Sequence, residues 1–218
     1  MPAHLLDFIF PQGISLQPKF SEMKVMKFGG TSVGKPERMH QVAQLITRHD
    51  EPTIVVLSAL SGTTNSLVAI GDAMASGNKE AAKQQIDALE AHYRSFVQSL
   101  VKSDASLSKA NGIVSEHFEF LNIILKISFS EALNKDILAQ GELLSTKLFS
   151  TFLDEAGISH ALLPALEFMV IDQHDEPQVG IIKQKLSNLL QQHADKKLFI
   201  TQGYICRNAR GEVDNLKR

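Results

Sequence analysis

A glycine-rich turn near the start of the chain is the clearest candidate for chemistry. The run Lys27-Phe28-Gly29-Gly30-Thr31-Ser32-Val33-Gly34 follows a short apolar stretch and precedes a helical pattern that opens at Pro36. Between a strand and a helix, such a turn lets backbone N–H groups approach a phosphate, and the start of the helix favours its negative charge. The same residues also suit a tight turn that needs glycine only for its backbone geometry. From this run alone, a phosphate site and a plain turn both stay open.

The turn also matches most of a well-known nucleotide-binding pattern. Gly29 to Lys35 satisfy the first seven positions of G-x-x-x-x-G-K-[ST], whose last hydroxyl holds Mg²⁺. The eighth position here is Pro36, which has no hydroxyl, so we do not interpret the run as the P-loop of a nucleoside triphosphatase. Lys27 has no acidic neighbour in the sequence. Beside a glycine turn, this favours a role with an anion over a solvated edge lysine.

Two later segments could face the same ligand, although neither shows a site by itself. Ser58 to Asn65 is a small, polar loop after an apolar strand, and such loops commonly supply only turns and helix caps. Glu142 lies in a helical pattern, where a lone glutamate is ordinarily a solvated surface residue. Cys206 has no base nearby in the sequence, and we interpret it as a small apolar strand residue.

The periodicity that must position these residues predicts an α/β fold. Apolar, β-branched runs predict strands at residues 24–28, 53–57, 160–163, 168–171 and 198–201. Helical patterns lie at residues 36–46, from the second loop to 74, at 137–156 and at 180–193. Two further helical stretches between residues 79 and 126, divided near 103–108, indicate a helical insertion or hairpin. We therefore expect a mostly parallel sheet between helical layers, with a turn at 208–211 before a last short strand.

Composition limits the classes of function. The chain has 218 residues, 44% of them hydrophobic and 21% charged, which suits one large or two small globular domains. Its formal net charge of -2 supplies no positive field for nucleic acid or an anionic membrane. One cysteine excludes an internal disulfide and fits a reducing compartment, and no His or Cys spacing suggests a metal site. Residues 1–22 are predicted to be an irregular extension without a signal peptide or membrane span, so we expect a cytoplasmic protein.

Three motifs, in chain order, resemble those of aspartokinases within the amino acid kinase family. Val25–Gly34 is similar to the family's opening signature, and Ser58–Asn65 to its second loop, Ser-Ala-x-x-Gly-x-Thr-Asn. Gly141-Glu142-Leu143-Leu144-Ser145 resembles the family's Gly-Glu-x-x-Ser motif. The resemblance covers residues 23–218 and implies the amino acid kinase fold.

The last part of the chain matches the family less closely. Thr201–Cys206 is similar to Thr-Gln-Gly-Phe-Ile-Gly, with Cys206 in place of the final glycine. Leu216-Lys217-Arg218 falls where the family has Leu-Gly-Arg. These departures resemble the kinase portion of some fused aspartokinase–homoserine dehydrogenases.

The resemblance implies an amino-acid-biosynthetic enzyme that transfers the γ-phosphoryl group of ATP to the side-chain carboxylate of L-aspartate. In the family, the glycine turn cradles the transferring phosphate and the strand lysine neutralises charge. The helix glutamate binds the substrate's amino group, and the arginine binds its α-carboxylate. Carried over to this chain, Lys27 is the catalytic residue. Phosphate contacts fall to Lys27, Gly29, Gly30, Thr31 and Ser32, and substrate contacts to Ser58, Thr64, Glu142 and Arg218.

The family continues after that arginine with a part that holds adenine, ribose and most Mg²⁺–phosphate contacts, and then with regulatory domains. We therefore expect residues 23–218 to be the substrate-binding part of the kinase domain. ATP and Mg²⁺ are the implied cofactors, with most of their ligands beyond Arg218. The isolated chain is expected to be inactive, and a full-length protein to be a homo-oligomer.

Two alternatives stay open. One is a different amino acid kinase, acting on glutamate, acetylglutamate, carbamate or a nucleotide, although the Gly-Glu-x-x-Ser element favours aspartate. The other is a non-catalytic fragment that retains an amino-acid pocket or an assembly surface, for which residues 79–126 are the leading candidate.

Overall fold

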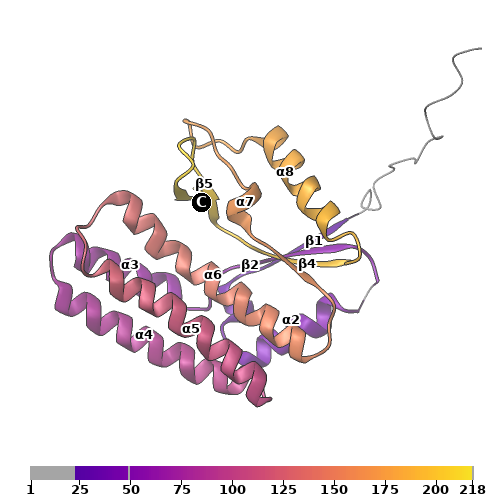
Figure 1. Ribbon diagram of the computed structural model, residues 1–218, viewed down its shortest axis with the longest axis horizontal. Helices are drawn as coiled ribbons and strands as arrows, with labels where there is room; N and C mark the ends of the chain where they lie inside the picture. Colours follow the sequence, from indigo (N-terminus) through magenta and orange to yellow (C-terminus); the bar gives the residue numbers. More distant parts are fainter. Residues whose placement is uncertain (1–22, 49, 218) are drawn as a thin grey trace, which may run out of the picture.

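A four-stranded sheet lies at the centre of the protein. The computed structural model describes residues 23–48 and 50–217. The strands follow the order β1 (Lys24–Phe28), β2 (Thr53–Leu57), β4 (Leu198–Gln202) and β3 (Ala161–Leu163). All three pairings are parallel, and helices lie on both faces of the sheet (Figure 1). The α/β fold with a parallel sheet between helical layers, as predicted from the sequence, is confirmed.

Alternate residues of the strands face two separate apolar cores, as the period of two along a strand requires. Val55 and Leu57 of β2 and Ile200 of β4 belong to the larger core, whereas Ile54 and Phe199 belong to the smaller one. The central strands are therefore apolar on both faces, which explains their continuous hydrophobic runs in the sequence.

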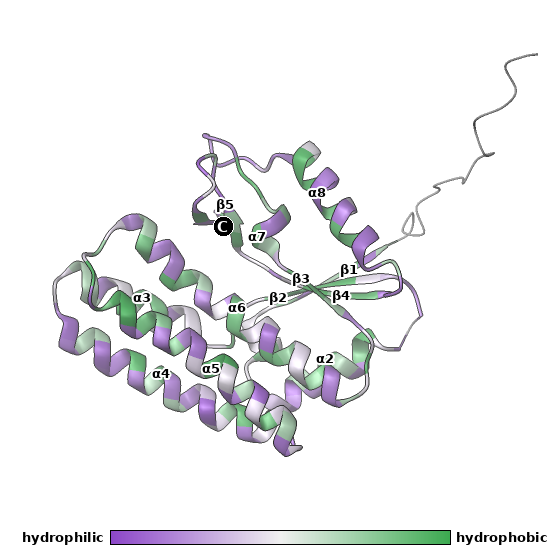
Figure 2. Cartoon of the chain, in the orientation of Figure 1, coloured by the Kyte–Doolittle hydropathy of each residue, from purple (hydrophilic) through white to green (hydrophobic). Residues whose placement is uncertain are grey.

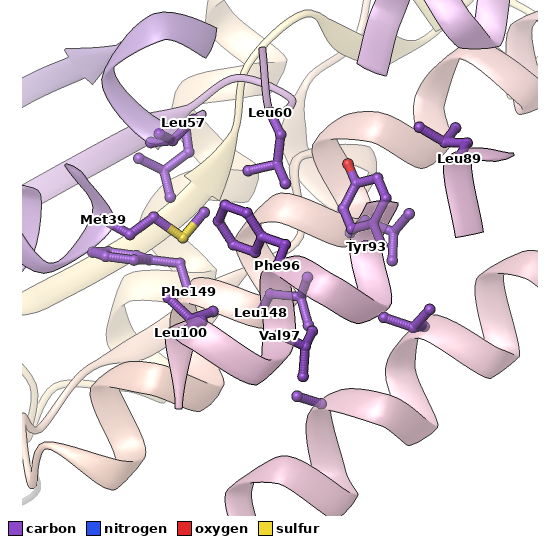
Figure 3. Packing of buried hydrophobic residues seen from close by; sticks show 14 of the residues in the cluster. Met39, Leu57, Leu60, Leu89, Tyr93, Phe96, Val97, Leu100, Leu148 and Phe149 are labelled. Carbon is purple, nitrogen blue, oxygen red and sulfur yellow. The ribbon is translucent and has the colours of Figure 1, made fainter. Parts of the chain in front are cut away.

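Five helices build the larger core. They are α2 (Pro36–Ile46), α3 (Thr63–Ala75), α4 (Lys79–Leu100), α5 (Asp104–Ile124) and α6 (Glu131–Glu155). The expected helical insertion corresponds to α4 and α5, which pack with α3 and α6 rather than projecting from the fold (Figure 1). Met39, Leu60, Phe96 and Phe149 meet in this core (Figure 3). Hydrophilic and hydrophobic patches alternate along α4 and α5, as expected of amphipathic helices (Figure 2).

The smaller core lies under two helices on the opposite face, α7 (Ala165–Phe168) and α8 (Val179–Gln192). The strand predicted at residues 168–171 is wrong. Pro164, with φ -66°, caps the start of the short helix α7 instead, and after this helix Val170 and Ile171 make only isolated bridges. The apolar run is buried here by a helical turn and a loop, an arrangement that a β-branched composition alone does not distinguish from a strand.

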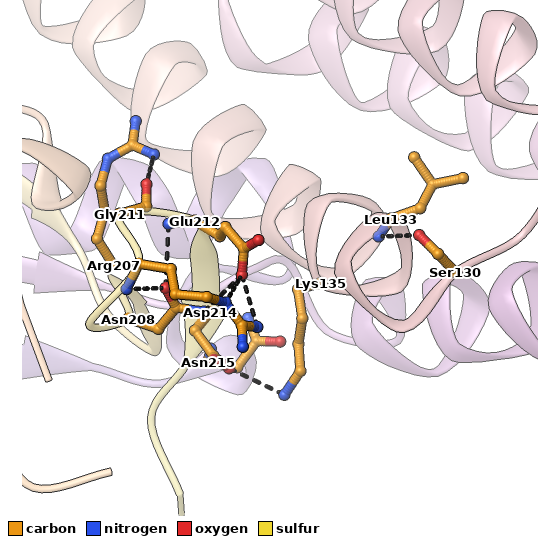
Figure 4. Close-up of polar contacts among 10 residues, drawn as sticks. Ser130, Leu133, Lys135, Arg207, Asn208, Gly211, Glu212, Asp214 and Asn215 are labelled. Atoms are coloured by element: carbon orange, nitrogen blue, oxygen red, sulfur yellow. Dashed lines mark hydrogen bonds and ion pairs between the residues drawn. The ribbon is translucent and has the colours of Figure 1, made fainter. Parts of the chain in front are cut away.

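A small hairpin closes the described chain. It joins β5 (Ile205–Arg207) to β6 (Val213–Asn215) through the turn that the sequence predicts. The Asn208 side chain accepts hydrogen bonds from the backbone N–H groups of Arg210 and Glu212, and the Lys135–Asp214 ion pair, at 3.0 Å, fixes the hairpin to α6 (Figure 4).

Helix α6 begins earlier than residue 137, where the sequence predicted it. Ser130 caps its first turn by accepting a hydrogen bond from the N–H of Leu133 at 3.2 Å. Two predictions lie outside the described residues: the irregular extension at 1–22 and the substrate contact of Arg218. In the part of the chain that is described, no helix is long and apolar enough to cross a membrane.

Candidate functional site

The candidate site is built at the carboxyl ends of three neighbouring strands. Phe28, Leu57 and Gln202 stand in one row of the sheet because Leu57 pairs with both of the others. The chain leaves this row at Gly29, Ser58 and Gly203. In open parallel sheets, ligands bind outside such carboxyl ends. The topology therefore brings together loops that are separated by more than a hundred residues in the sequence.

A cavity of about 640 Å³ lies at this edge. It is lined by the glycine turn, the second loop, one residue of α6 and two segments near the end of the chain. The lining residues are Lys27, Gly29, Gly30, Thr31, Ser58, Ala59, Leu60, Ser61, Gly62, Thr64, Asn65, Glu142, Tyr204, Leu216 and Lys217. The structure thus brings together seven of the nine residues that the resemblance implied: Lys27, Gly29, Gly30, Thr31, Ser58, Thr64 and Glu142.

The glycine turn packs directly against the second loop. Its residues form a short helix, α1 (Gly30–Val33), immediately after Gly29. A Cβ atom on Gly30 would lie 3.0 Å from the carbonyl oxygen of Ala59, and one on Gly34 would lie 2.6 Å from the Cβ of Ser61. A Cβ on Gly29 would meet nothing within 4 Å. Gly30 and Gly34 therefore allow the two loops to touch, whereas Gly29 leaves open space in the cavity.

Helix α6 reaches the second loop from the other side. A Cβ on Gly141 would lie 2.7 Å from the Cβ of Ala59, so glycine permits the closest approach of the helix to the loop. One turn later, the Ser145 hydroxyl donates a hydrogen bond of 2.8 Å to the carbonyl of Ser58. Between these two contacts lies Glu142, which is 4% exposed and lines the cavity. The glycine and serine of the Gly-Glu-x-x-Ser motif thus fix the helix on the loop, and the glutamate is held between them.

The cavity carries opposite charges on different walls. Lys27 on β1 is exposed and makes no salt bridge with any described residue, while Glu142 supplies the negative charge on α6. Lys217 also lines the cavity but forms an ion pair with Asp175. A free cation beside open glycine backbone suits an anionic ligand, and a buried carboxylate suits a cationic group. Together they suit a zwitterion next to a phosphate.

Tyr204 is a cavity residue that sequence reasoning did not assign to the site. It has φ 65°, in the left-handed region that bulky residues rarely adopt. Ile205 N–H donates to the Gly203 carbonyl at 2.7 Å across this turn, and Leu216 N–H donates to the Tyr204 carbonyl at 2.7 Å. Such strain persists where surrounding contacts enforce it, and it is common at ligand sites. In the sequence, Tyr204 is indicated only by the Thr-Gln-Gly run that directly precedes it.

The other two implied residues are Ser32 and Arg218. Ser32 lies instead in a shallower depression beside α2, with Arg38, whose guanidinium donates to the Thr31 carbonyl. The structure gives no support to Ser32 as a direct phosphate contact. Arg218 lies outside the described residues. Conversely, Ser61, Asn65, Tyr204 and Lys217 line the cavity without having been predicted to do so.

The described residues do not form a metal site of their own. No group of three or more His, Cys, Asp or Glu side chains in the described ranges is placed to hold an ion. Among the described lining residues Glu142 is the one carboxylate, so they do not supply a cluster of carboxylate oxygens for Mg²⁺. Cys206 is buried away from the cavity, and burial raises the pKa of its thiol to about 11. A nucleophilic role for Cys206 is therefore disfavoured.

Comparisons with known proteins match this fold and much of this sequence. Aspartokinase III of Escherichia coli, solved in complex with aspartate and ADP, superposes with a TM-score of 0.76 at 26% identity, covering 90% of this chain and 44% of that chain. The bifunctional aspartokinase/homoserine dehydrogenase 2 of Escherichia coli is 30% identical over 195 residues, which are 88% of this chain and 24% of that protein. The chloroplastic aspartokinase 3 of Arabidopsis thaliana is 34% identical over 167 residues, 73% of this chain and 29% of that protein.

The chain therefore spans about a quarter of the length of these two curated relatives and 44% of the solved structure. The family model described as the amino acid kinase family matches residues 22–217, a range that includes every described residue. This chain belongs to the amino acid kinase family.

Proposed function

We propose that the chain is the substrate-binding part of an aspartokinase, which transfers the γ-phosphoryl group of ATP to the side-chain carboxylate of L-aspartate. One observation carries the proposal. Lys27 and Glu142, 115 positions apart, line the same cavity with two glycine- and hydroxyl-rich loops between them. The solved relative that holds aspartate and ADP, and the relatives that are aspartokinases by name, support this choice of substrates.

Glu142 is proposed to bind the ammonium group of aspartate. Glu142 is 4% exposed, and its helix is fixed by the Gly141 contact and the Ser145 hydrogen bond. A carboxylate held in this way opposes a cation without first losing much side-chain freedom. Ser58 and Thr64 line the same cavity, and their hydroxyls are proposed to contact the substrate. Arg218 is proposed to bind the α-carboxylate, as the family resemblance implies.

Lys27 and the glycine turn are proposed to serve the transferring phosphoryl group. The aspartate side chain is already ionised at neutral pH, so the transfer needs no general base to create the nucleophile. Catalysis then consists of positioning the two reactants in line and stabilising the charge on the phosphoryl oxygens. The exposed ammonium of Lys27 and the open backbone at Gly29 are suited to that task. No step is assigned to Mg²⁺, because the described residues do not form its site.

Residues 23–218 are accordingly proposed to be one part of a longer kinase domain. A cytoplasmic location and a homo-oligomeric full-length protein also stay predictions. A non-catalytic amino-acid-binding fragment would also bind the amino acid. Only a measurement of phosphoryl transfer therefore distinguishes it from a kinase.

The test begins with calorimetric titration of L-aspartate into this chain and into Glu142→Gln. The substitution keeps the shape of the side chain but removes its charge. Hydrogen bonds to charged groups contribute about 1.5–3 kcal/mol, so we expect about a tenfold or larger loss of aspartate affinity. Glu116→Gln, an exposed glutamate on α5, is the matched control and should bind aspartate normally. Equal affinity of Glu142→Gln and the parent chain would remove Glu142 from the proposed site.

Activity is tested by hydroxylamine trapping of aspartyl phosphate. This chain is compared with a polypeptide of the length of the aspartokinase relatives, each with ATP and with aspartate, glutamate or neither. Aspartate-dependent hydroxamate from the longer polypeptide is the expected result. Preference for glutamate would assign the fold to another amino acid kinase, and aspartate binding without hydroxamate from either would leave the non-catalytic alternative.

A further inference from the structure

A buried tyrosine of the helical layer reaches the loop that forms the cavity. Tyr93 lies on α4 and is completely buried, among the core side chains near Leu60 (Figure 3). Its hydroxyl oxygen lies 3.0 Å from the hydroxyl oxygen of Thr63, which is itself 1% exposed. The contact joins residues 30 positions apart and links α4 to the second loop. A polar pair in an otherwise apolar core calls for a reason beyond packing.

Thr63 stands where three parts of the site meet. It is the first residue of α3, directly after Gly62, which has φ 86° and lines the cavity. The next residue, Thr64, also lines the cavity. On the other side, the methyl group of Thr63 lies 3.3 Å from where a Cβ of Gly141 would be, beside Glu142. Any shift of Thr63 therefore displaces the start of α3 and the surface on which α6 rests.

We propose that Tyr93 is a positioning residue for the substrate pocket: its hydroxyl holds Thr63, and through Thr63 it fixes Thr64 and the neighbourhood of Glu142. The inference rests on the proposed function for the identity of the ligand, aspartate. It extends that function by giving α4 a part in binding, although no residue of α4 lines the cavity. In the loop motif Ser-Ala-x-x-Gly-x-Thr-Asn, Thr63 occupies a variable position, so the motif itself does not reveal this role.

The chemistry of the pair suits a fixed hydrogen bond and not proton transfer. Burial raises the pKa of the Tyr93 phenol far above its ordinary value. The hydrogen bond with Thr63 lowers this pKa, and the negative charge of Glu142 raises it further, so the net shift is upward. Tyr93 therefore stays neutral at working pH and can donate to Thr63. If either hydroxyl were lost, the other would be left buried without its partner, and that deficit favours a local rearrangement of the loop.

The test is a double-mutant cycle on this chain with Tyr93→Phe, Thr63→Val and the double variant. Aspartate affinity is measured by calorimetry at a temperature well below unfolding, and backbone hydrogen exchange is followed for residues 58–66. Each single variant leaves one buried hydroxyl unpaired, so we expect about fivefold weaker aspartate binding and faster exchange in this segment. The double variant replaces both hydroxyls with apolar groups and should return to within about twofold of the parent affinity.

A matched control separates positioning from general stability. Thr151→Val removes a buried hydroxyl from α6 that donates only within its own helix, to the Lys147 carbonyl at 3.0 Å. It should lower the unfolding temperature without changing aspartate affinity or exchange at residues 58–66. Unchanged aspartate affinity and unchanged exchange in both single variants would overturn the inference. A double variant whose loss of aspartate affinity equals the sum of the two single losses would also overturn it.

An incorrect choice of substrate can be distinguished from an incorrect role for Tyr93 by the aspartate affinity of the parent chain. If the parent chain binds no aspartate, the proposed substrate is wrong whatever Tyr93 does. Hydrogen exchange then decides alone: faster exchange at residues 58–66 in the single variants, restored in the double variant, supports the Tyr93–Thr63 link as a support of the pocket, and unchanged exchange refutes it.

Discussion

Replacing Gly141 by alanine tests whether the contact between α6 and the second loop builds the site. In an ordinary helix interior, glycine to alanine stabilises by about 1 kcal/mol. At this position the new Cβ would lie 2.7 Å from the Cβ of Ala59 and 3.3 Å from side-chain atoms of Thr63 and Leu67. Overpacking of this kind costs about 1–3 kcal/mol, so the helix-propensity gain is cancelled or exceeded.

The clash also has a consequence for binding. Relief of the contact requires α6 and the loop to move apart, which lengthens the 2.8 Å hydrogen bond from Ser145 to the Ser58 carbonyl. Loss of one such bond is worth about 1 kcal/mol, so we expect aspartate affinity to fall by about fivefold or more.

Gly112 provides the matched control, because it lies within α5 and its Cβ would meet nothing within 4 Å. Gly112→Ala should raise the unfolding temperature by about 2–4 °C, as about 1 kcal/mol does for a chain of this size, and leave aspartate binding unchanged. Thermal unfolding and calorimetry of both variants are the assays. A Gly141→Ala chain as stabilised as Gly112→Ala, with unaltered aspartate affinity, would refute the role given to this contact.

Two further predictions concern charge. In a polypeptide of the length of the relatives, Lys27→Ala should lower turnover by about 10²–10³-fold while aspartate affinity changes little. Lys24 is an exposed lysine on the same strand, so Lys24→Ala is the control and should leave turnover unchanged. Near-normal turnover of Lys27→Ala would remove Lys27 from the mechanism. Burial, and then the positive charge of Lys147, lowers the pKa of His117, whose Nδ1 lies 2.6 Å from the Gln140 amide oxygen. Between the lowered pKa and the ordinary value of about 6.5, His117 is protonated in the unfolded chain but neutral in the folded protein. The free energy of unfolding should therefore fall as the pH drops below about 6.5, and this part of the pH dependence should be absent in His117→Asn. The same thermal-unfolding slope from pH 7.5 to 5.5 in both proteins would contradict it.

Most of the fold could be predicted from local sequence because local and tertiary preferences agree. The strands at 24–28 and 53–57 are apolar or β-branched and end at glycine or small polar residues, and the structure has them at the same bounds. The helical hairpin divides where Ser103 caps α5 by accepting from the N–H of Ser106. Prediction failed at residues 168–171, where the composition favours a strand but Pro164 starts a helical turn that covers the sheet.

Only the site residues that belong to sequence motifs could be predicted. Seven implied residues meet at one cavity because the parallel register aligns the strand ends. Ser32 lies outside this cavity for a local reason: α1 begins at Gly30, so successive residues point to different sides of the turn, and Ser32 lies in the depression beside α2. Tyr93 could not be found from sequence, because an aromatic residue at a buried position of an amphipathic helix has the pattern of any core residue.

The second loop contacts both the glycine turn and α6, the two parts of the site that carry Lys27 and Glu142 at the cavity. Gly30 and Gly34 bring the phosphate turn against one side of it, and Gly141 brings α6 against the other. The distance from Lys27 to Glu142 is thus set by two close contacts with a single loop, and not by the sheet alone. A substitution that widens the Gly30 contact should therefore disturb the phosphate side first, whereas one at Gly141 should disturb the aspartate side first. Positioning of about 1 Å matters greatly in phosphoryl transfer, so a change on either side should reduce turnover even where binding of one ligand survives. If the proposed function is correct, the close-packed glycines at these points set the spacing between the two ligands, which the strand ends of the sheet cannot do without the loop between them.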